Sequence, residues 1–200
     1  MSIQKTYIQQ LYYDGQTYTK GSVVDLLGKF NIGCLNFPFN RNPKPKDLPT
    51  RDWAGEDGKD VYIPDTIPMA HYDMEVTFLY VRNTADNGNE GVSGETVEQT
   101  RNRLMRQDIG NFIDFLYGRI KGNPNDQNEI QSGRLAIYDE RSGMGRKDVV
   151  VSEIENELFY VSDNDSDIVA RFKVKFTVYD PTTEVTPATG QNGTITTLNF

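Results

Sequence analysis

Hydrophobic positions along this chain recur mainly with a period of two, which is the period of β-strands. Residues 8–13 and 17–23 are rich in aromatic and β-branched side chains, and they flank Asp14-Gly15, a dipeptide typical of tight hairpin turns. The chain therefore predicts an opening β-hairpin. A third run over residues 29–39 changes phase near Cys34, which predicts a bulge or a bend at that point.

Two later segments alternate most clearly. Residues 74–81 carry apolar side chains on both faces near their end, which favours a central strand covered on each side. Residues 169–179 place apolar side chains on one face and polar ones on the other, so one face of this strand is expected to be buried. Asp180-Pro181 ends the strand, because proline cannot donate a ladder hydrogen bond. Shorter strands are predicted over residues 135–138, 149–154 and 158–162.

One segment has a helical period instead. Thr96 and Gln99 have the spacing of a capping box, and Gly118 supplies a left-handed end. Between them, apolar residues follow one face of a helix over about residues 97–117: Met105, Ile109, Phe112, Ile113 and Leu116. We expect this helix to lie on a sheet that includes residues 74–81 and 169–179. The predicted fold class is therefore mainly β with one principal helix, a β-sandwich or barrel packed by that helix.

The pattern disappears between residues 40 and 68, where prolines and glycines interrupt the chain. We interpret this segment as an extended arm or long loop, with a short strand at residues 61–63. Its candidate contact residues are Arg41, Lys44, Lys46, Arg51 and Trp53, the only tryptophan. A basic arm with an aromatic anchor is typical of an interface and is expected to dock on a neighbouring subunit. A solvated irregular loop, with Trp53 folded back as a local plug, is the alternative.

The composition indicates one globular domain over residues 1–181, followed by an extended C-terminal tail over residues 182–200. With 36% hydrophobic and 25% charged residues, the 200-residue chain is not of the disordered class. Its 21 basic and 29 acidic residues give a net charge of −8, which argues against direct binding of nucleic acid. No segment approaches the about 20 apolar residues of a membrane helix, so we expect no membrane insertion.

Little in the sequence points to catalysis. The single cysteine and single histidine, Cys34 and His71, exclude an intrachain disulfide and the common zinc ligand sets from one chain. Residues 163–167 imitate the start of a calcium loop, but Ile168 and Val174 stand where that loop needs Gly and Glu. We therefore expect no enzyme, no cofactor and no metal, and a protein made in a reducing cytoplasm.

Charge placement is more informative. Glu153, Glu155 and Glu157 alternate along a predicted strand and would project from the same face. In a ring of subunits that face would form an acidic belt toward a channel, and this is the first hypothesis. A salt-bridged seam with the basic positions 171, 173 and 175 of a neighbour is the alternative.

The order of these elements resembles that of tail structural proteins of tailed bacteriophages. The resemblance lies in the strand 74–81, the helix that ends in Phe115-Leu-Tyr-Gly118, and the last strand, Phe172-x-Val-x-Phe-x-Val-x-Asp-Pro181. More narrowly, this pattern is similar to the ring-forming domain of distal tail proteins, which shares its fold with tail-tube proteins. It spans about residues 74–181.

The resemblance implies a virion structural protein that forms a hexameric ring around a central channel, at or near the tail tube. The protein would lie in the virion tail after assembly in the host cytoplasm. Its implied partners are further copies of itself, tail-tube and tape-measure proteins, and DNA in passage only, without sequence-specific binding. The long arm departs from larger distal tail proteins, so a tail-completion or neck protein joining head and tail is one alternative. A non-viral β-sandwich binding module is the other.

Overall fold

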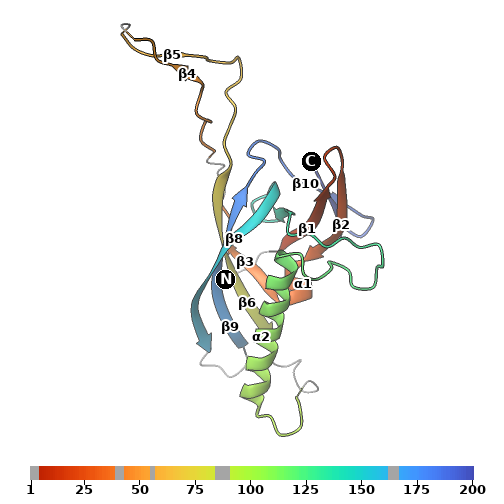
Figure 1. Cartoon of the computed structure of the whole chain (residues 1–200). Helices are drawn as coiled ribbons and strands as arrows, with labels where there is room; N and C mark the ends of the chain where they lie inside the picture. Colours follow the sequence, from red (N-terminus) through yellow and green to blue (C-terminus); the bar gives the residue numbers. More distant parts are fainter. Residues whose placement is uncertain (1–4, 39–42, 55–56, 84–90, 162–166) are drawn as a thin grey trace.

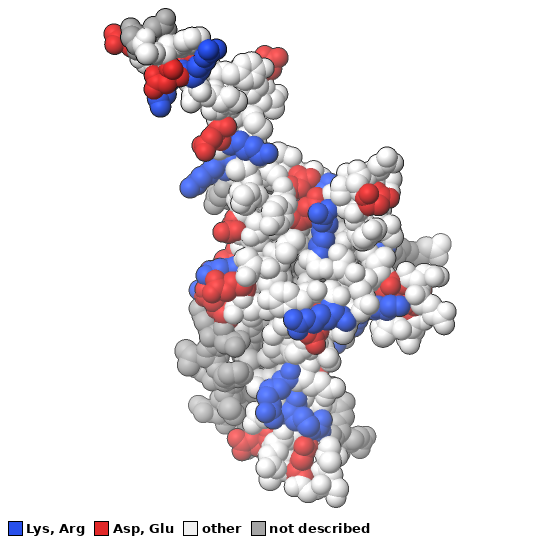
Figure 2. Space-filling model, in the orientation of Figure 1, with Lys and Arg blue, Asp and Glu red and all other residues white. Residues whose placement is uncertain are grey.

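The computed structural model describes residues 5–38, 43–54, 57–83, 91–161 and 167–200, and only the backbone of residues 83, 156–161 and 167–169. A rounded body carries a long arm that projects away from it, as the ribbon and space-filling views both show (Figures 1 and 2). Seven strands of the body form one antiparallel sheet in the order β2-β1-β7-β8-β9-β6-β3. The strands are β1 (Thr6–Tyr13), β2 (Tyr18–Asp25), β3 (Ile32–Asn36), β6 (Tyr72–Asn83), β7 (Leu135–Asp139), β8 (Met144–Val161) and β9 (Asp167–Val178).

The opening hairpin is confirmed. Strands β1 and β2 pair antiparallel, with Tyr13 opposite Tyr18. In the turn, the Asp14 carboxylate accepts hydrogen bonds from the amides of Gln16 and Thr17, and Gly15 has a φ of 104° that favours glycine. The turn is therefore specified by its own side chains.

The third apolar run forms two elements instead of one strand. The short helix α1 (Leu26–Phe30) comes first, and the Asp25 carboxylate caps it by accepting from the amides of Leu27 and Gly28. Strand β3 follows, and its register with β6 shifts between Cys34 and Asn36, which confirms the predicted bulge. The helix was not predicted because five residues are too few to show a period.

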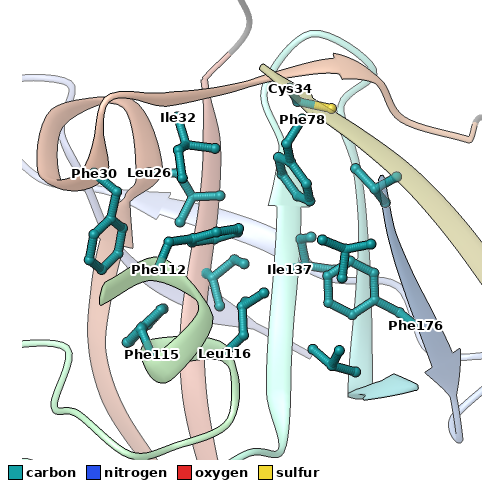
Figure 3. Close-up of a cluster of buried hydrophobic side chains, with 14 of the residues drawn as sticks. Leu26, Phe30, Ile32, Cys34, Phe78, Phe112, Phe115, Leu116, Ile137 and Phe176 are labelled. Carbon is teal, nitrogen blue, oxygen red and sulfur yellow. The ribbon is translucent and has the colours of Figure 1, made fainter. Parts of the chain in front are cut away.

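The principal helix, α2 (Val97–Leu116), begins at the predicted capping box, in which the Thr96 hydroxyl accepts from the Gln99 amide at 3.2 Å. Gly118 follows the helix with a φ of 70°. Phe112 is fully buried, and its ring centroid lies 5.3 Å from that of Phe78 on β6 and 6.0 Å from that of Phe172 on β9 (Figure 3). The mainly β fold with one main helix is thus confirmed.

Strand β8 differs from the prediction of two short strands. It runs through 18 residues and pairs with β9 along most of its length. Its register shifts between Val151 and Glu153 and again between Asn156 and Phe159. Each bulge reverses the inward and outward phase of the side chains, so the sequence pattern has a break although the strand continues.

The C-terminal segment was expected to be an extended tail, and that expectation is wrong. Strands β10 (Thr186–Thr189) and β11 (Ile195–Asn199) form a hairpin that packs on the face of the sheet opposite α2. Val185 and Leu198 are buried there against Tyr7, Leu11 and Tyr138. The Leu198 amide donates to the buried Gln9 side chain at 3.1 Å. Few residues of this segment reach the core, so it shows no hydrophobic period.

Each edge strand of the sheet makes a contact beyond its one paired neighbour. On β2, the Glu129 carboxylate accepts from the Ser22 amide at 2.6 Å and from the Ser22 hydroxyl at 2.7 Å. On β3, the Cys34 thiol is buried beside Thr6 and Asp139, at the ends of β1 and β7, so the sheet is strongly curled. Neither α1 nor α2, the helices of the described residues, has the length and apolar character needed to cross a membrane.

Candidate interaction site

The arm is a narrow two-legged ribbon formed by residues 43–54 and 57–70. Strands β4 (Thr50–Arg51) and β5 (Asp60–Val61) pair antiparallel near its tip. Nearer the body, the Lys46 amide donates to the Pro68 carbonyl at 2.8 Å, and the Ala70 amide donates to the Lys44 carbonyl at 2.8 Å. These bonds hold the two legs side by side without a hydrophobic core.

The base of the arm is anchored in the body. The second leg continues into β6, whose first residue, Tyr72, is partly buried. The Arg146 side chain of β8 is almost fully buried, and its Nε donates to the Tyr72 hydroxyl at 2.7 Å. This hydrogen bond fixes the point at which the arm leaves the sheet.

Trp53 joins the two legs at the tip. Its indole Nε1 donates to an Asp60 carboxylate oxygen at 2.9 Å, and the Arg51 guanidinium lies 3.5 Å from the centroid of its ring. The side chain is nevertheless 42% exposed. Trp53 therefore links the two legs of the arm, and it still presents apolar surface to a partner.

The returning leg exposes a row of apolar side chains. Twelve large apolar side chains are exposed among the described residues, and six of them lie between residues 53 and 69 of the arm. The most exposed are Tyr62 and Ile63, at 68% and 69%. A concentration of exposed apolar side chains in one segment is typical of an interaction site. We call this set the apolar row: Trp53, Val61, Tyr62, Ile63, Ile67 and Met69.

The charge of the arm changes along its length, and the expected basic residues that the structure describes lie in its first leg. Lys44 and Lys46 are exposed there, whereas Arg41 lies outside the described residues. Beyond Arg51 the described acidic residues outnumber the basic ones, and Lys59 lies 3.9 Å from Asp52. The acidic residues of the tip and returning leg are Asp52, Asp57, Asp60 and Asp65. Figure 2 shows both signs of charge near the tip.

The acidic strand does not form an unpaired belt. Glu153 and Glu155 lie opposite Lys175 and Lys173 on β9. Lys175 Nζ lies 3.0 Å from a Glu153 oxygen and also pairs with Glu155. The hydrogen bond from Lys175 lowers the pKa of Glu155, and the two carboxylates raise the pKa of Lys175. The side chain of Glu157 lies outside the described residues.

The ion pairs across these strands also bear on the alternative hypothesis, a salt-bridged seam between subunits. Lys173 Nζ lies 3.2 Å from a Glu75 oxygen on β6, so both lysines pair across neighbouring strands of their own sheet. Sequence spacing places charges on a face, but it does not show which strand lies beside which. The cross-strand partners were therefore missed.

A second charged surface, not predicted, surrounds the end of the β1–β2 hairpin. The rings of Tyr13 and Tyr18 stack with centroids 4.7 Å apart, and Phe200 meets Tyr18 edge-on at 5.3 Å. Lys20 Nζ lies 4.0 Å from the Phe200 centroid, and Lys147 Nζ lies 4.7 Å from the Tyr18 centroid. We call these residues and Arg134 the aromatic–cation patch. Sequence reasoning missed it because its members lie far apart in the chain.

Carboxylates balance only part of the positive charge of the patch. Burial, followed by the hydrogen bond that Tyr18 donates to Asp148, raises the pKa of Tyr18 to about 12. Lys147 pairs with Asp180 at 3.1 Å, and Arg134 lies 3.7 Å from Asp148. Burial lowers the pKa of Lys20, and the neighbouring Lys147 lowers it further.

The other residues considered for catalysis or metal binding lie apart from one another in the described part of the structure. Burial and the Asp139 carboxylate raise the pKa of Cys34 to about 12, so its thiol remains protonated. His71 is exposed at the base of the arm, with its ring 5.7 Å from that of Tyr179. Within the described residues, no three His, Cys, Asp or Glu side chains are arranged to hold a metal ion. The acidic loop 163–166 lies outside them.

An open groove of about 560 Å³ lies beside the first turns of α2. Glu95 and Arg103 line it, and they pair with each other at 3.0 Å. The Thr100 hydroxyl also donates to Glu95, at 3.1 Å. The Glu95 carboxylate is thus engaged in holding the start of the helix.

Comparisons with known proteins do not assign the chain to a group. No protein family matches the sequence, and a search of curated proteins gives no match.

Proposed function

We propose that this protein is a structural subunit that assembles with copies of itself, the arm of one copy docking on an adjacent copy. The observation that carries the proposal is the apolar row on an arm that projects from the body. Exposing this row to water is unfavourable, and covering it would offset the entropy lost when the arm is ordered against a partner. The arm contains roughly as many residues as one side of a standard interface, about 20–30.

The reach of the arm supports a bridging role. Each leg contains enough extended residues to span up to about 45 Å. A compact body made of the remaining residues has a diameter of about 40 Å. The fully extended length of a leg is therefore comparable to the width of a neighbour, which suits a subunit that links copies in a closed assembly.

We further propose that the assembly is a ring of a bacteriophage tail, distal-tail-like or tail-tube-like, and hexameric. The curled sheet, covered by α2 on one face and by the β10–β11 hairpin on the other, suits the sandwich-plus-helix body of that class. The face of Glu153 and Glu155 is a candidate channel lining. Its carboxylates are balanced by Lys173 and Lys175, so DNA would pass a nearly neutral surface.

The test uses the full chain and an armless variant. Residues 47–67 are replaced by Asn-Gly, which joins Lys46 to Pro68, the pair already hydrogen-bonded at the base. Light scattering after size-exclusion chromatography should give an oligomer for the full chain and a folded monomer for the variant, with similar far-ultraviolet circular dichroism. A full chain that stays monomeric, or an armless variant that assembles equally well, would refute the proposal.

Electron microscopy of the oligomer then separates the alternatives. Rings with a central channel are expected, and an open or two-fold assembly would exclude the tail ring. Rings that stack into tubes favour a tube position. Single rings fit a distal-tail or a neck protein, and co-purification with a tail-tube or a head-completion protein distinguishes these two. A monomer that binds a ligand of another kind would favour the binding-module alternative.

A further inference from the structure

The aromatic–cation patch contains a cation, Lys20, that no described carboxylate of its own chain balances. Lys20 Nζ donates to the Leu198 carbonyl at 2.7 Å and lies over the Phe200 ring. No carboxylate of the described residues lies within ion-pair distance of it, although Lys147 and Arg134 have Asp180 and Asp148. A partly buried ammonium beside a second cation favours an incoming carboxylate.

The patch also offers surface for aromatic and apolar contacts. Tyr13, which stacks on Tyr18, is 41% exposed. Tyrosine and arginine are enriched among the residues that dominate binding energies in interfaces. Arg134, 5.6 Å from the Tyr13 centroid, adds such a group, and its side chain is 41% exposed. The surface is thus both cationic and aromatic in a chain whose net charge is −8.

The outer part of the arm has the complementary character. Its described residues from Arg51 to Asp65 include four aspartates against two cations, together with Trp53, Tyr62 and Ile63. Arg51 is occupied by stacking on Trp53, and Lys59 lies near Asp52. The remaining negative charge is carried by exposed side chains such as Asp57 and Asp65.

The arm of the same chain does not supply this partner. The arm leaves the body through β6, whereas the patch lies at the end of β1 and β2, and the two project on different sides of the body in Figure 1. No hydrogen bond or ion pair of the described residues joins them. A second copy carries both surfaces, so one contact repeated around a ring would satisfy each patch.

We propose that the acidic, aromatic tip of one copy's arm docks on the aromatic–cation patch of the adjacent copy. This inference rests on the proposed function, and it adds the surface that receives the arm. Carboxylates of the tip meet Lys20 and Arg134, while the apolar row packs against Tyr13. Because the contact joins opposite charges, raising the salt concentration from about 0.05 to about 0.5 M should weaken assembly.

Charge reversal tests the contact. Lys20→Glu and Asp57→Lys should each weaken self-association at least about tenfold in sedimentation experiments. The double variant, which restores opposite charges with the signs exchanged, should recover most of the loss. Arg141→Glu is the matched control, because it makes the same change of charge at an exposed residue at the other end of β7. Thermal denaturation of each variant checks that the body remains folded.

The outcomes separate this inference from the proposed function. A monomeric full chain overturns both. If the full chain assembles and the armless variant does not, but Lys20→Glu behaves like Arg141→Glu, the arm docks elsewhere and only the receiving surface is wrong. Unchanged association in both single variants overturns the contact between the arm tip and the patch.

Discussion

Replacing Phe112 with alanine tests whether α2 is a central part of the core. Phe112 is fully buried, and its ring lies within 6.0 Å, between centroids, of Phe30, Phe78 and Phe172. These partners come from α1, β6 and β9, so one side chain connects the helix to two neighbouring strands and to the short helix. Figure 3 shows Phe112 beside Phe30 and Phe78.

The magnitude follows from this burial. A buried Phe→Ala change costs about 3–5 kcal/mol, because transfer energy is lost and the cavity collapses only in part. Each aromatic pair contributes about 0.5–1.5 kcal/mol beyond its buried area, so the loss of three pairs favours the upper half of the range. For a chain of this length, a loss of about 4 kcal/mol lowers the melting temperature by roughly 8–16 °C.

Denaturation in urea, followed by circular dichroism, measures the change. Gln107→Ala is the matched control, because Gln107 is exposed on the same helix and its replacement should stay within about 0.5 kcal/mol. A loss below about 1 kcal/mol for Phe112→Ala, with an unchanged dependence on urea, would contradict the packing described for α2.

Four further predictions test other parts of the structure. Leu198→Ala should lower the free energy of unfolding by about 2–5 kcal/mol in urea denaturation, because Leu198 is fully buried; an unattached tail would give no change. Gly118→Ala should cost at least about 2 kcal/mol in the same assay, since φ is 70° and the added Cβ would lie 2.3 Å from the Ser132 carbonyl carbon. Thr96→Ala should reduce thermal stability by about 1 kcal/mol through loss of the cap, and a neutral result would argue against the capping box. Burial opposes ionisation of Asp180, but hydrogen bonds from Thr183 and Thr182 and the Lys147 ammonium outweigh it and lower the pKa of Asp180 to about 2. The unfolded pKa of Asp is about 3.9, so this stabilisation is complete above about pH 4 and is lost as the pH falls toward 2. Asp180→Asn should therefore destabilise the protein more at pH 6 than near pH 2, and an equal effect at both pH values would contradict the shift.

The sequence by itself determined the elements whose signals are local. The β1–β2 hairpin follows from Asp14-Gly15 between β-favouring runs, and α2 follows from its capping box and its apolar face. The strands β6 and β9 follow from clean alternation. In each case a few neighbouring residues contain both the pattern and the turn chemistry that ends it, so no distant contact is needed to specify the element.

For the candidate site, the sequence located the arm and its tryptophan. Prolines and the absence of a period predict an extended segment that has no core of its own. The change from positive charge near the body to negative charge at the tip was missed, because the sequence does not show which residues form the tip of the ribbon. That depends on the pairing of β4 with β5, which brings Asp60 back beside Trp53.

Only the tertiary structure decided the features that join distant residues. Helix α1 is too short to show a period, and packing of Leu26 and Phe30 in the core stabilises it. The C-terminal hairpin has few buried residues, and the β1–β7 surface beneath it provides their partners. The lysines that balance Glu153 and the cations around Tyr18 are likewise neighbours only across strands. Hydrophobic periodicity records which face of an element is buried, but the partner on that face is chosen by long-range packing, which the sequence pattern does not contain.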